Sequence, residues 1–226
     1  MFFSDAGLLG AEAENPELRI EQNHMPMKKQ NRWEDHYSRK AKKEKFPARS
    51  VYKLQEIQRK THLIRKGDKV LDLGCAPGSW LLYVAELAGK KGEVVGVDLK
   101  PLSVNIPSGV RVYTGDILSP DEDLLLSMGK DFNVVMSDLA PVTTGNRHVD
   151  TARSFNLAQA ALTIAHEVLV PGGSFVCKIF QGEDFKAFSD TVKTGFKKHK
   201  IFKPQSSRKG SREIYIIGIG KLKREA

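Results

Sequence analysis

Only two of the 226 residues are cysteines, and both lie in short apolar, strand-like stretches. We therefore expect Cys75 and Cys177 to be reduced thiols in the core of a cytoplasmic protein, and we predict no disulfide and no metal site. No apolar run approaches the roughly 20 residues that span a membrane. Asp5, Glu12 and Glu14 stand where a secretory signal would need basic and then apolar residues. These absences argue against a stapled secreted scaffold and a membrane protein.

Basic residues outnumber acidic ones by 36 to 27, and they are unevenly distributed. Residues 28–66 carry a net charge of +10, as do residues 193–224, whereas residues 67–192 carry −6 and residues 1–27 carry −4. Two basic stretches around an acidic centre predict that the ends fold together into a face that binds a polyanion. The simpler alternative is a set of scattered, solvated lysines. We expect residues 1–27 to be a disordered extension, residues 28–66 a basic helical segment and residues 67–226 the main domain.

Short β-rich runs alternate with amphipathic segments from Lys69 onward, which indicates parallel strands joined by helices and ligands at the carboxyl ends of the strands. The last two runs have only a turn-rich segment between them and predict an antiparallel hairpin. The expected strands are 70–73, 94–99, 110–113, 134–137 and 174–179, the expected helices are 79–88, 120–128, 152–169 and 184–196, and the hairpin strands are 201–203 and 213–219.

The first expected strand ends in a turn with two glycines, Gly74 and Gly78, followed by a helix. Glycine lets the backbone approach a ligand closely, although a purely structural turn would also use it. Acidic residues lie at or just after the ends of the first four strands: Asp72, Asp98, Asp116 and Asp138. Each alone could be a helix cap or turn former. Together they disfavour a phosphate-rich ligand and suit a cation such as the sulfonium of S-adenosylmethionine.

Five motifs between about residues 33 and 220 carry a resemblance to a known family. They are Ala48-Arg-Ser-Val-Tyr-Lys53-Leu, Asp72-Leu-Gly-Cys-Ala-Pro-Gly78-Ser-Trp80, Ser137-Asp138-Leu-Ala-Pro141, Pro171-Gly-Gly-Ser-Phe-Val-Cys-Lys178-Ile-Phe-Gln-Gly and Ser206-Ser-Arg-Lys-Gly-Ser-Arg-Glu213-Ile-Tyr215. In this order they resemble the FtsJ/RrmJ family of RNA 2'-O-ribose methyltransferases. The resemblance implies a Rossmann-like α/β fold that binds S-adenosylmethionine, with a mostly parallel sheet, a C-terminal antiparallel hairpin and helices on both faces.

The resemblance also implies roles for individual residues. The family's catalytic Lys-Asp-Lys-Glu tetrad corresponds to Lys53, Asp138, Lys178 and Glu213. The implied cofactor contacts are Gly74, Pro77, Gly78, Trp80, Asp98, Asp116 and Asp138. Compact bacterial members modify a uridine of 23S rRNA in the large ribosomal subunit, so that RNA is the expected partner, with no obligate protein partner. A tRNA ribose methyltransferase of the same family and a non-catalytic RNA-binding ribosome-assembly factor remain alternatives.

A ribose 2'-hydroxyl must lose its proton as it attacks a methyl group, so the site needs a base or a positive charge beside the developing alkoxide. Lys178 is the expected group. Repulsion from Lys53 and partial burial would favour its neutral form, whereas Glu213 would oppose that shift. Both roles, general base and electrostatic stabiliser, remain open at this point.

RNA has to be held by its backbone, and the basic stretches supply the expected contacts. Trp33, His36 and Tyr37 are interleaved with the first stretch and could either stack on bases or pack an N-terminal helix against the body. The expected RNA-binding residues are Arg32, Arg39, Lys42, Lys43, Arg49, Arg208, Lys209 and Arg212.

Overall fold

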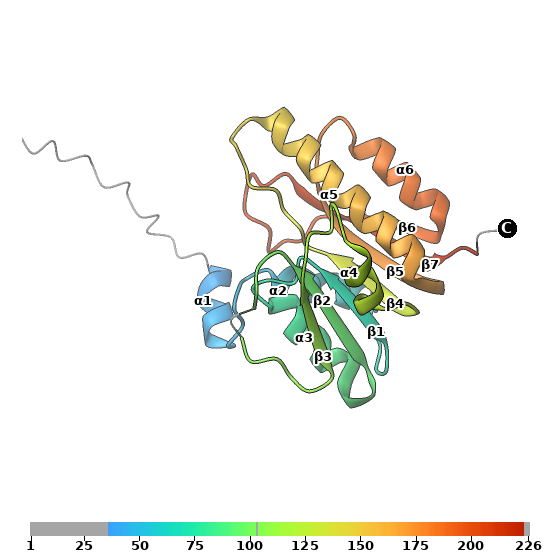
Figure 1. Cartoon of the computed structure of the whole chain (residues 1–226). Helices are drawn as coiled ribbons and strands as arrows, with labels where there is room; N and C mark the ends of the chain where they lie inside the picture. Colours follow the sequence, from blue (N-terminus) through green and yellow to red (C-terminus); the bar gives the residue numbers. More distant parts are fainter. Residues whose placement is uncertain (1–35, 103, 224–226) are drawn as a thin grey trace, which may run out of the picture. The chain divides into compact units, whose positions relative to one another are not determined.

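The computed structural model describes residues 36–102 and 104–223, all of which belong to one compact unit running from Asp35 to Ala226. A seven-stranded sheet has the order β3-β2-β1-β4-β5-β7-β6 (Figure 1). Strands β1 to β5 are parallel neighbours, and β7 is antiparallel to both β5 and β6. The strands are β1 (Lys69–Leu73), β2 (Glu93–Asp98), β3 (Val110–Thr114), β4 (Phe132–Ser137), β5 (Leu169–Phe180), β6 (Phe196–Phe202) and β7 (Glu213–Lys221).

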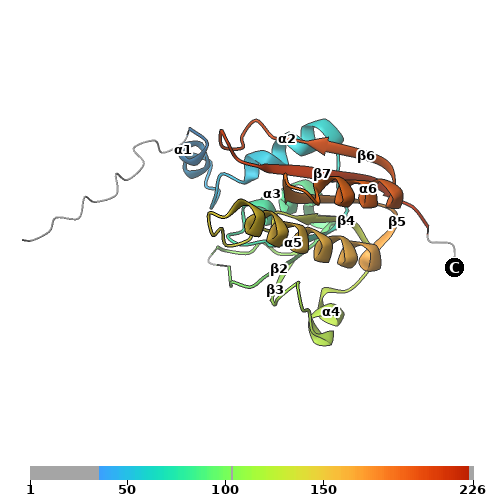
Figure 2. The same cartoon turned by 90° about the horizontal axis from the view of Figure 1, so that it is seen from above.

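Helices cover both faces of this sheet, and Figure 2 shows α5 on one side of the strands and α2 on the other. The helices are α1 (His36–Lys43), α2 (Val51–Thr61), α3 (Ser79–Ala88), α4 (Glu122–Met128), α5 (Arg147–Val168) and α6 (Phe185–Gly195), with a short 3-10 turn, η1, at Gly89–Lys91. None of the described helices is long and apolar enough to pass through a membrane.

Alternation along the strands separates two cores. In β1, Leu71 and Leu73 join the core under α4, α5 and α6, whereas Val70 faces α2 and α3. The same period of two continues in β4, where Val135 joins the first core and Met136 the second. Cys75 and Cys177 are buried free thiols, one in each core, as expected.

The fold class is confirmed, including the parallel strands and the C-terminal hairpin. Three element starts differ from expectation by five residues. Strand β5 begins at Leu169 rather than residue 174, because Leu169 already pairs with Phe132 of β4 before an irregularity in the register. Helix α5 begins at Arg147 rather than residue 152, because the Asn146 side chain accepts hydrogen bonds from the N–H groups of His148 and Val149. Strand β6 begins at Phe196 rather than residue 201, because its exposed lysines suit an edge strand and it pairs with β7 along its length.

The chain order places a switch point between β1 and β4. From β1 the chain continues outward to β2 and β3, and from β4 it continues in the opposite direction to β5. Ligands of open α/β sheets bind at the carboxyl ends of the strands at such a point. The turn after β1 and the residue after β4, Asp138, lie there.

Candidate active site

The predicted tetrad comes together from four separate segments. Lys53 lies in α2, Asp138 directly follows β4, Lys178 lies in β5 and Glu213 begins β7. The Nζ atom of Lys178 lies 3.0 Å from Oδ1 of Asp138 and also donates to the Asp138 backbone carbonyl. The Nζ atom of Lys53 lies 2.8 Å from Oε1 of Glu213 and 2.9 Å from Oε2. The site therefore consists of two ion pairs.

Both ion pairs are largely removed from water. The exposed fractions of the side chains are 6% for Lys178, 15% for Asp138, 11% for Lys53 and 12% for Glu213. Burial alone would raise the pKa of Asp138, but Lys178, Lys53 and a hydroxyl group donated by Tyr215 outweigh it and hold that pKa below its usual value. Asp138 is thus a carboxylate, and its position links the two lysines.

Tyr215 is a member of the site that the sequence did not single out. Its hydroxyl donates to Oδ1 of Asp138 at 2.6 Å, and its ring is fully buried. Burial, followed by the charges of Asp138 and Glu213, raises the pKa of Tyr215 well above its usual value, so the phenol keeps its proton. The available signal was its spacing: Glu213 and Tyr215 are two residues apart in a strand and share one face.

A set of hydrogen bonds fastens α2 to the loop between β6 and β7. The two carboxylate oxygens of Glu56 accept from the backbone N–H groups of Gln205, at 2.7 Å, and Ser206, at 2.9 Å. The Arg49 guanidinium donates to the carbonyl of Ser206. Because Lys53 lies one turn before Glu56 and the loop leads into Glu213, these bonds fix the distance between the two members of the second ion pair. Glu56 was not anticipated from the sequence.

The glycine turn after β1 depends on the absence of side chains at two positions. A Cβ atom on Gly74 would lie 2.7 Å from Cδ2 of Leu139, and one on Gly78 would lie 2.8 Å from Cγ2 of Val104. Both glycines also have positive φ angles, of 85° and 107°. Pro77, between them, is exposed. The turn thus presents close-packed backbone at the switch point.

Acidic strand ends surround this turn. Asp98, the last residue of β2, accepts hydrogen bonds from the N–H groups of Ala76 and Lys100, both at 2.9 Å. Asp116, after β3, is exposed and accepts from the N–H of Leu118 at 2.9 Å. Asp98 therefore ties the end of β2 to the turn and leaves the remaining lone pairs of its carboxylate for a ligand.

Trp80 lies deeper than a ligand contact would require. It is 3% exposed and belongs to the core that α2 and α3 share. Its Nε1–H donates to the carbonyl of Ser50 at 2.8 Å, and its ring centre lies 5.8 Å from that of Tyr215. In the structure Trp80 supports the start of α2 and the tyrosine of the site, while its contact with a cofactor stays a prediction.

Asp72 is a buried acid with an unusual environment. It is fully buried in β1, and neither carboxylate oxygen has a hydrogen-bond partner within the described part of the chain. Burial, followed by the charges of Asp138 and Asp98, raises the pKa of Asp72 well above its usual value. The protein alone therefore favours the neutral acid, and a cation bound at the turn would favour the carboxylate.

This environment predicts a pH-dependent effect of the substitution Asp72→Asn. A carboxyl with a raised folded-state pKa contributes stability below its unfolded pKa of about 3.9 and loses that contribution as the pH rises. Asparagine does not titrate, so the stability of the variant relative to the unsubstituted protein should increase between pH 5 and pH 8. Urea unfolding at several pH values without added ligand measures this increase. A pH-independent difference would show that Asp72 is already charged and paired.

The predicted RNA-binding residues lie on two segments that approach each other. Arg39, Lys42 and Lys43 are exposed on α1, and Arg208 and Lys209 are exposed in the loop between β6 and β7. The Arg49 guanidinium donates to the carbonyl of Ser206, so the two basic segments meet there, and burial and then the charge of Arg208 lower the pKa of Arg49. The remaining predicted residue of the loop, Arg212, is half-buried.

Other members of the prediction have different positions. Arg49 is half-buried and bonded to Ser206, so it also has a structural role. Tyr37 packs against Tyr52, with ring centres 5.4 Å apart, which supports the packing alternative for this aromatic residue. His36 is exposed at the start of α1. Arg32 and Trp33 lie outside the described residues.

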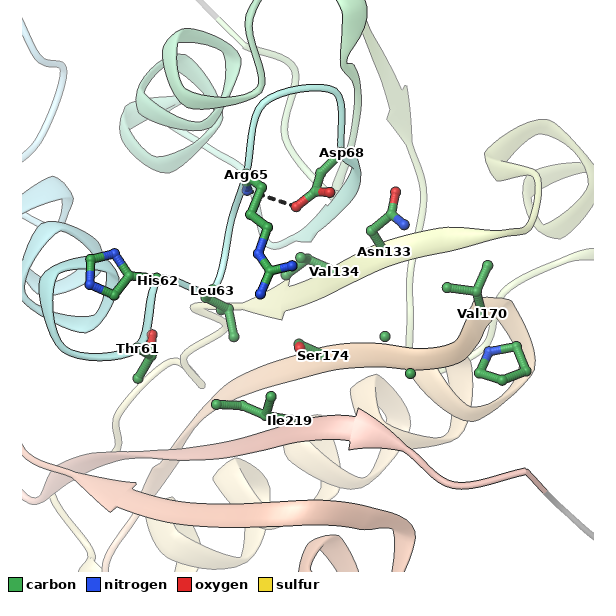
Figure 3. Close-up of a pocket in the computed structure, with 13 residues that line it drawn as sticks. Thr61, His62, Leu63, Arg65, Asp68, Asn133, Val134, Val170, Ser174 and Ile219 are labelled. Carbon is green, nitrogen blue, oxygen red and sulfur yellow. Dashed lines mark hydrogen bonds between the residues drawn. The ribbon is translucent and has the colours of Figure 1, made fainter.

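A cavity of about 250 Å³ lies at the other end of the strands (Figure 3). Asn133 and Val134 at the start of β4, Ser174 in β5 and Ile219 near the end of β7 line it. Lys178 is four residues beyond Ser174 toward the carboxyl end of β5. The tetrad and this cavity therefore lie at opposite ends of the strands.

A mostly parallel α/β sheet with a glycine turn and acidic strand ends at its switch point is the arrangement of a Rossmann-like enzyme. The family model described as FtsJ-like methyltransferase matches residues 46–221. The chain belongs to this family and is a methyltransferase, which confirms the resemblance carried by the five motifs.

Named relatives agree with this assignment. The chain is 55% identical over 193 residues to "Ribosomal RNA large subunit methyltransferase E" of Desulforapulum autotrophicum, an alignment that covers 85% of this chain and 95% of the relative. It is 53% identical over 194 residues to the protein of the same name from Desulfatibacillum aliphaticivorans, with 86% and 94% covered. A crystal structure described as a ribosomal RNA methyltransferase of Plasmodium falciparum has a TM-score of 0.71 at 25% identity, with 79% of this chain and 100% of that chain covered.

Proposed function

We propose that this protein transfers a methyl group from S-adenosylmethionine to the ribose 2'-hydroxyl of a uridine in 23S rRNA of the large ribosomal subunit. The observation that carries the proposal is the convergence of Lys53, Asp138, Lys178 and Glu213 beside the glycine turn. The names of its relatives support ribosomal RNA of the large subunit as the class of RNA that is methylated. We propose large ribosomal subunits in the cytoplasm as the substrate.

The residues around the turn fit S-adenosylmethionine. Asp72 is a buried carboxyl without a hydrogen-bond partner among the described residues, and Asp98 and Asp138 add two more acids, so the site favours a cationic ligand. We propose that Asp98 and Asp116 hold the adenosine part and that Gly74, Pro77 and Gly78 supply backbone contacts. When bound, this cofactor supplies an electrophilic methyl group on a positively charged sulfur.

We propose that Lys178 stabilises the negative charge that develops on the 2'-oxygen as this oxygen forms its bond to the methyl carbon, the methyl–sulfur bond breaks and the hydroxyl proton passes to solvent water. A lysine ammonium has three hydrogens, and two acceptors of Asp138, a carboxylate oxygen and the backbone carbonyl, occupy two of the directions. The third remains to donate to the ribose oxygen. Because the Nζ atom of Lys178 faces the Asp138 carboxylate at 3.0 Å, we propose the electrostatic role over that of a general base. Lys53 and Glu213 orient the ribose 2'-hydroxyl, and the charge of each offsets that of the other.

The cofactor assignment predicts a strong effect of Asp98→Ala on binding of S-adenosylmethionine. Loss of hydrogen bonds to a charged acceptor costs about 1.5–3 kcal/mol, which corresponds to roughly a 10- to 150-fold weaker affinity. Isothermal titration calorimetry measures it directly. Asp190→Ala, which removes an exposed acid of α6 that pairs with Lys186, is the matched control and should bind normally. Equal affinities of the two variants would count against Asp98 as a cofactor residue.

The substrate is tested by methylating purified large ribosomal subunits and bulk tRNA with radiolabelled S-adenosylmethionine, followed by mapping of the labelled nucleotide. We expect the label on one uridine ribose of the large-subunit RNA. Label on tRNA alone would favour the tRNA alternative. Binding of the cofactor without transfer to either RNA would favour a non-catalytic assembly factor.

A further inference from the structure

The outer face of α2 forms one side of two adjoining cavities, which we call the α2 groove. The first cavity, of about 270 Å³, is lined by Tyr37, Lys40, Tyr52, Gln55 and Tyr83 together with Glu56, Arg59 and Gln205. The second, of about 370 Å³, is lined by Lys60, Phe202 and Lys203 together with the same Glu56, Arg59 and Gln205. Because three residues are shared, the two cavities are neighbouring compartments of a single groove.

Aromatic rings supply flat apolar surface in both compartments. In the first, Lys40 lies over Tyr52 at 4.6 Å from the ring centre and Arg49 lies over Tyr37 at 5.4 Å. The cations of this compartment thus lie over Tyr37 and Tyr52. We therefore assign the third ring of the compartment, that of the half-buried Tyr83, to stacking with a base. In the second, the half-buried Phe202 has the Nζ atom of Lys60 at 5.3 Å from its ring centre.

The groove is positively charged despite its central acid. Arg59, Lys60 and Lys203 are all exposed along it, and Lys40 borders the first compartment and pairs with Glu44 at 3.8 Å. The carboxylate of Glu56 is occupied by two backbone N–H groups, at 2.7 and 2.9 Å, which offset its charge. Gln55 and Gln205 add amide groups that can donate to and accept from the edge of a base.

We propose that the α2 groove binds two successive unpaired nucleotides of the RNA substrate beside the nucleotide to be methylated. The base of one packs on Tyr83, the base of the next lies against Phe202 together with the Lys60 ammonium over its ring, and Arg59, which both compartments share, contacts the phosphate between them. The inference rests on the proposed function. Rings alternating with cations are the usual means of holding single-stranded nucleic acid, whereas the bases of a duplex are stacked and out of reach.

The position of the groove relative to the tetrad supports this occupant. Lys53 and Arg59 are six residues apart on the same helix, which is about 9 Å along its axis. One faces Glu213 in the site, and the other faces the groove. A strand whose ribose lies at Lys178 therefore reaches the groove within a few nucleotides.

The proposal is tested with two pairs of variants and a fluorescently labelled single-stranded RNA of ten nucleotides. The double substitution Arg59→Gln with Lys60→Gln removes two charges from the groove. The control, Lys90→Gln with Lys91→Gln, removes two exposed charges from η1 that line neither compartment. We expect the groove variant to bind about tenfold more weakly and the control to change less than twofold. The log–log dependence of affinity on salt should become shallower by at least about 0.7 in the groove variant alone, since Arg59 is the proposed phosphate contact and each single-strand phosphate contact contributes about 0.7.

The aromatic part is tested with Tyr83→Leu and Tyr83→Phe. Leucine removes the ring and should weaken binding at least about fivefold, whereas phenylalanine keeps the ring and should restore normal binding. Thermal melting and calorimetry with S-adenosylmethionine serve as controls for the folding of each variant. A duplex of the same RNA should bind the groove variants and the unsubstituted protein equally.

Methyl transfer to large subunits is measured on the same preparations. If the unsubstituted protein methylates subunits and the groove variants bind single-stranded RNA as well as it does, the groove proposal is wrong and the proposed function stands. Groove variants that lose activity on intact subunits yet bind and methylate protein-free RNA normally would indicate a ribosomal protein in the groove and would also overturn it. An unsubstituted protein that binds the probe through the groove but methylates no RNA would contradict the proposed function alone.

Discussion

Replacing Lys178 by alanine is expected to lower kcat for methyl transfer by about 10²- to 10³-fold, the usual loss for a donor that stabilises a developing oxyanion. The Lys178 ammonium is 6% exposed and is held by Asp138, so its charge acts in a site with little water to screen it. Affinity for S-adenosylmethionine should change little, because the glycine turn and Asp98 are unaffected. Single-turnover methylation and calorimetry separate these two effects.

Arginine at the same position distinguishes the two roles of Lys178. Lys178→Arg keeps the positive charge and removes the capacity to act as a base near neutral pH, so it should retain more activity than Lys178→Ala if the role is electrostatic. Lys186→Ala, at an exposed lysine of α6, is the control and should be fully active. Normal turnover by Lys178→Ala would refute the assignment of this lysine to the chemistry.

Breaking the Lys53–Glu213 pair is expected to cost about 3 kcal/mol of unfolding free energy, the lower end of the range for a buried pair that loses one partner. The lower end applies to Glu213→Leu because Asp138 still offsets part of the Lys53 charge. Lys53→Met leaves the carboxylate of Glu213 buried without its partner, because the Glu213 side chain is only 12% exposed and that of Lys53 only 11%. Urea unfolding of both single variants measures the cost.

The double variant separates structure from catalysis. Lys53→Met combined with Glu213→Leu replaces both charges with apolar groups, and we expect its stability to return to within about 1 kcal/mol of the unsubstituted protein. Methyl transfer should stay strongly reduced in both single variants and in the double variant. Restored activity in the stable double variant would show that this pair only holds α2 against β7.

Local sequence patterns were sufficient for most of the fold. The β-rich runs that became β1 to β4 end within one residue of the expected positions. In β1, β2 and β4 the reason is that a strand buried on both faces needs a short continuous apolar run, whereas β3 is a partly exposed edge strand. The start of α5 was missed by five residues, because there a single cap, Asn146, decides where the helix begins. The four residues of the tetrad could be named from motifs. They are spread from position 53 to position 213, so the sequence does not give the distances between their side chains.

Tyr215 and Glu56 show what local reasoning could not reach. Tyr215 contacts Asp138 only because β7 lies between β5 and β6 and places this tyrosine opposite Lys178. Glu56 reads as an ordinary acid of an amphipathic helix until the loop at Gln205 folds onto it. Both roles arise from contacts between segments more than 70 residues apart.

The sequence by itself determined that the protein forms an α/β sheet and which family motifs it carries. The period of its apolar residues and its glycine turns are local properties, so they can be recognised without a fold. Only the tertiary structure decided how the charges combine. The two basic ends meet because α2 is bonded to the loop after β6, and two lysines and two acids form buried pairs because β7 inserts beside β5. Coulomb interactions depend on distance and burial, and neither quantity exists until the chain is folded.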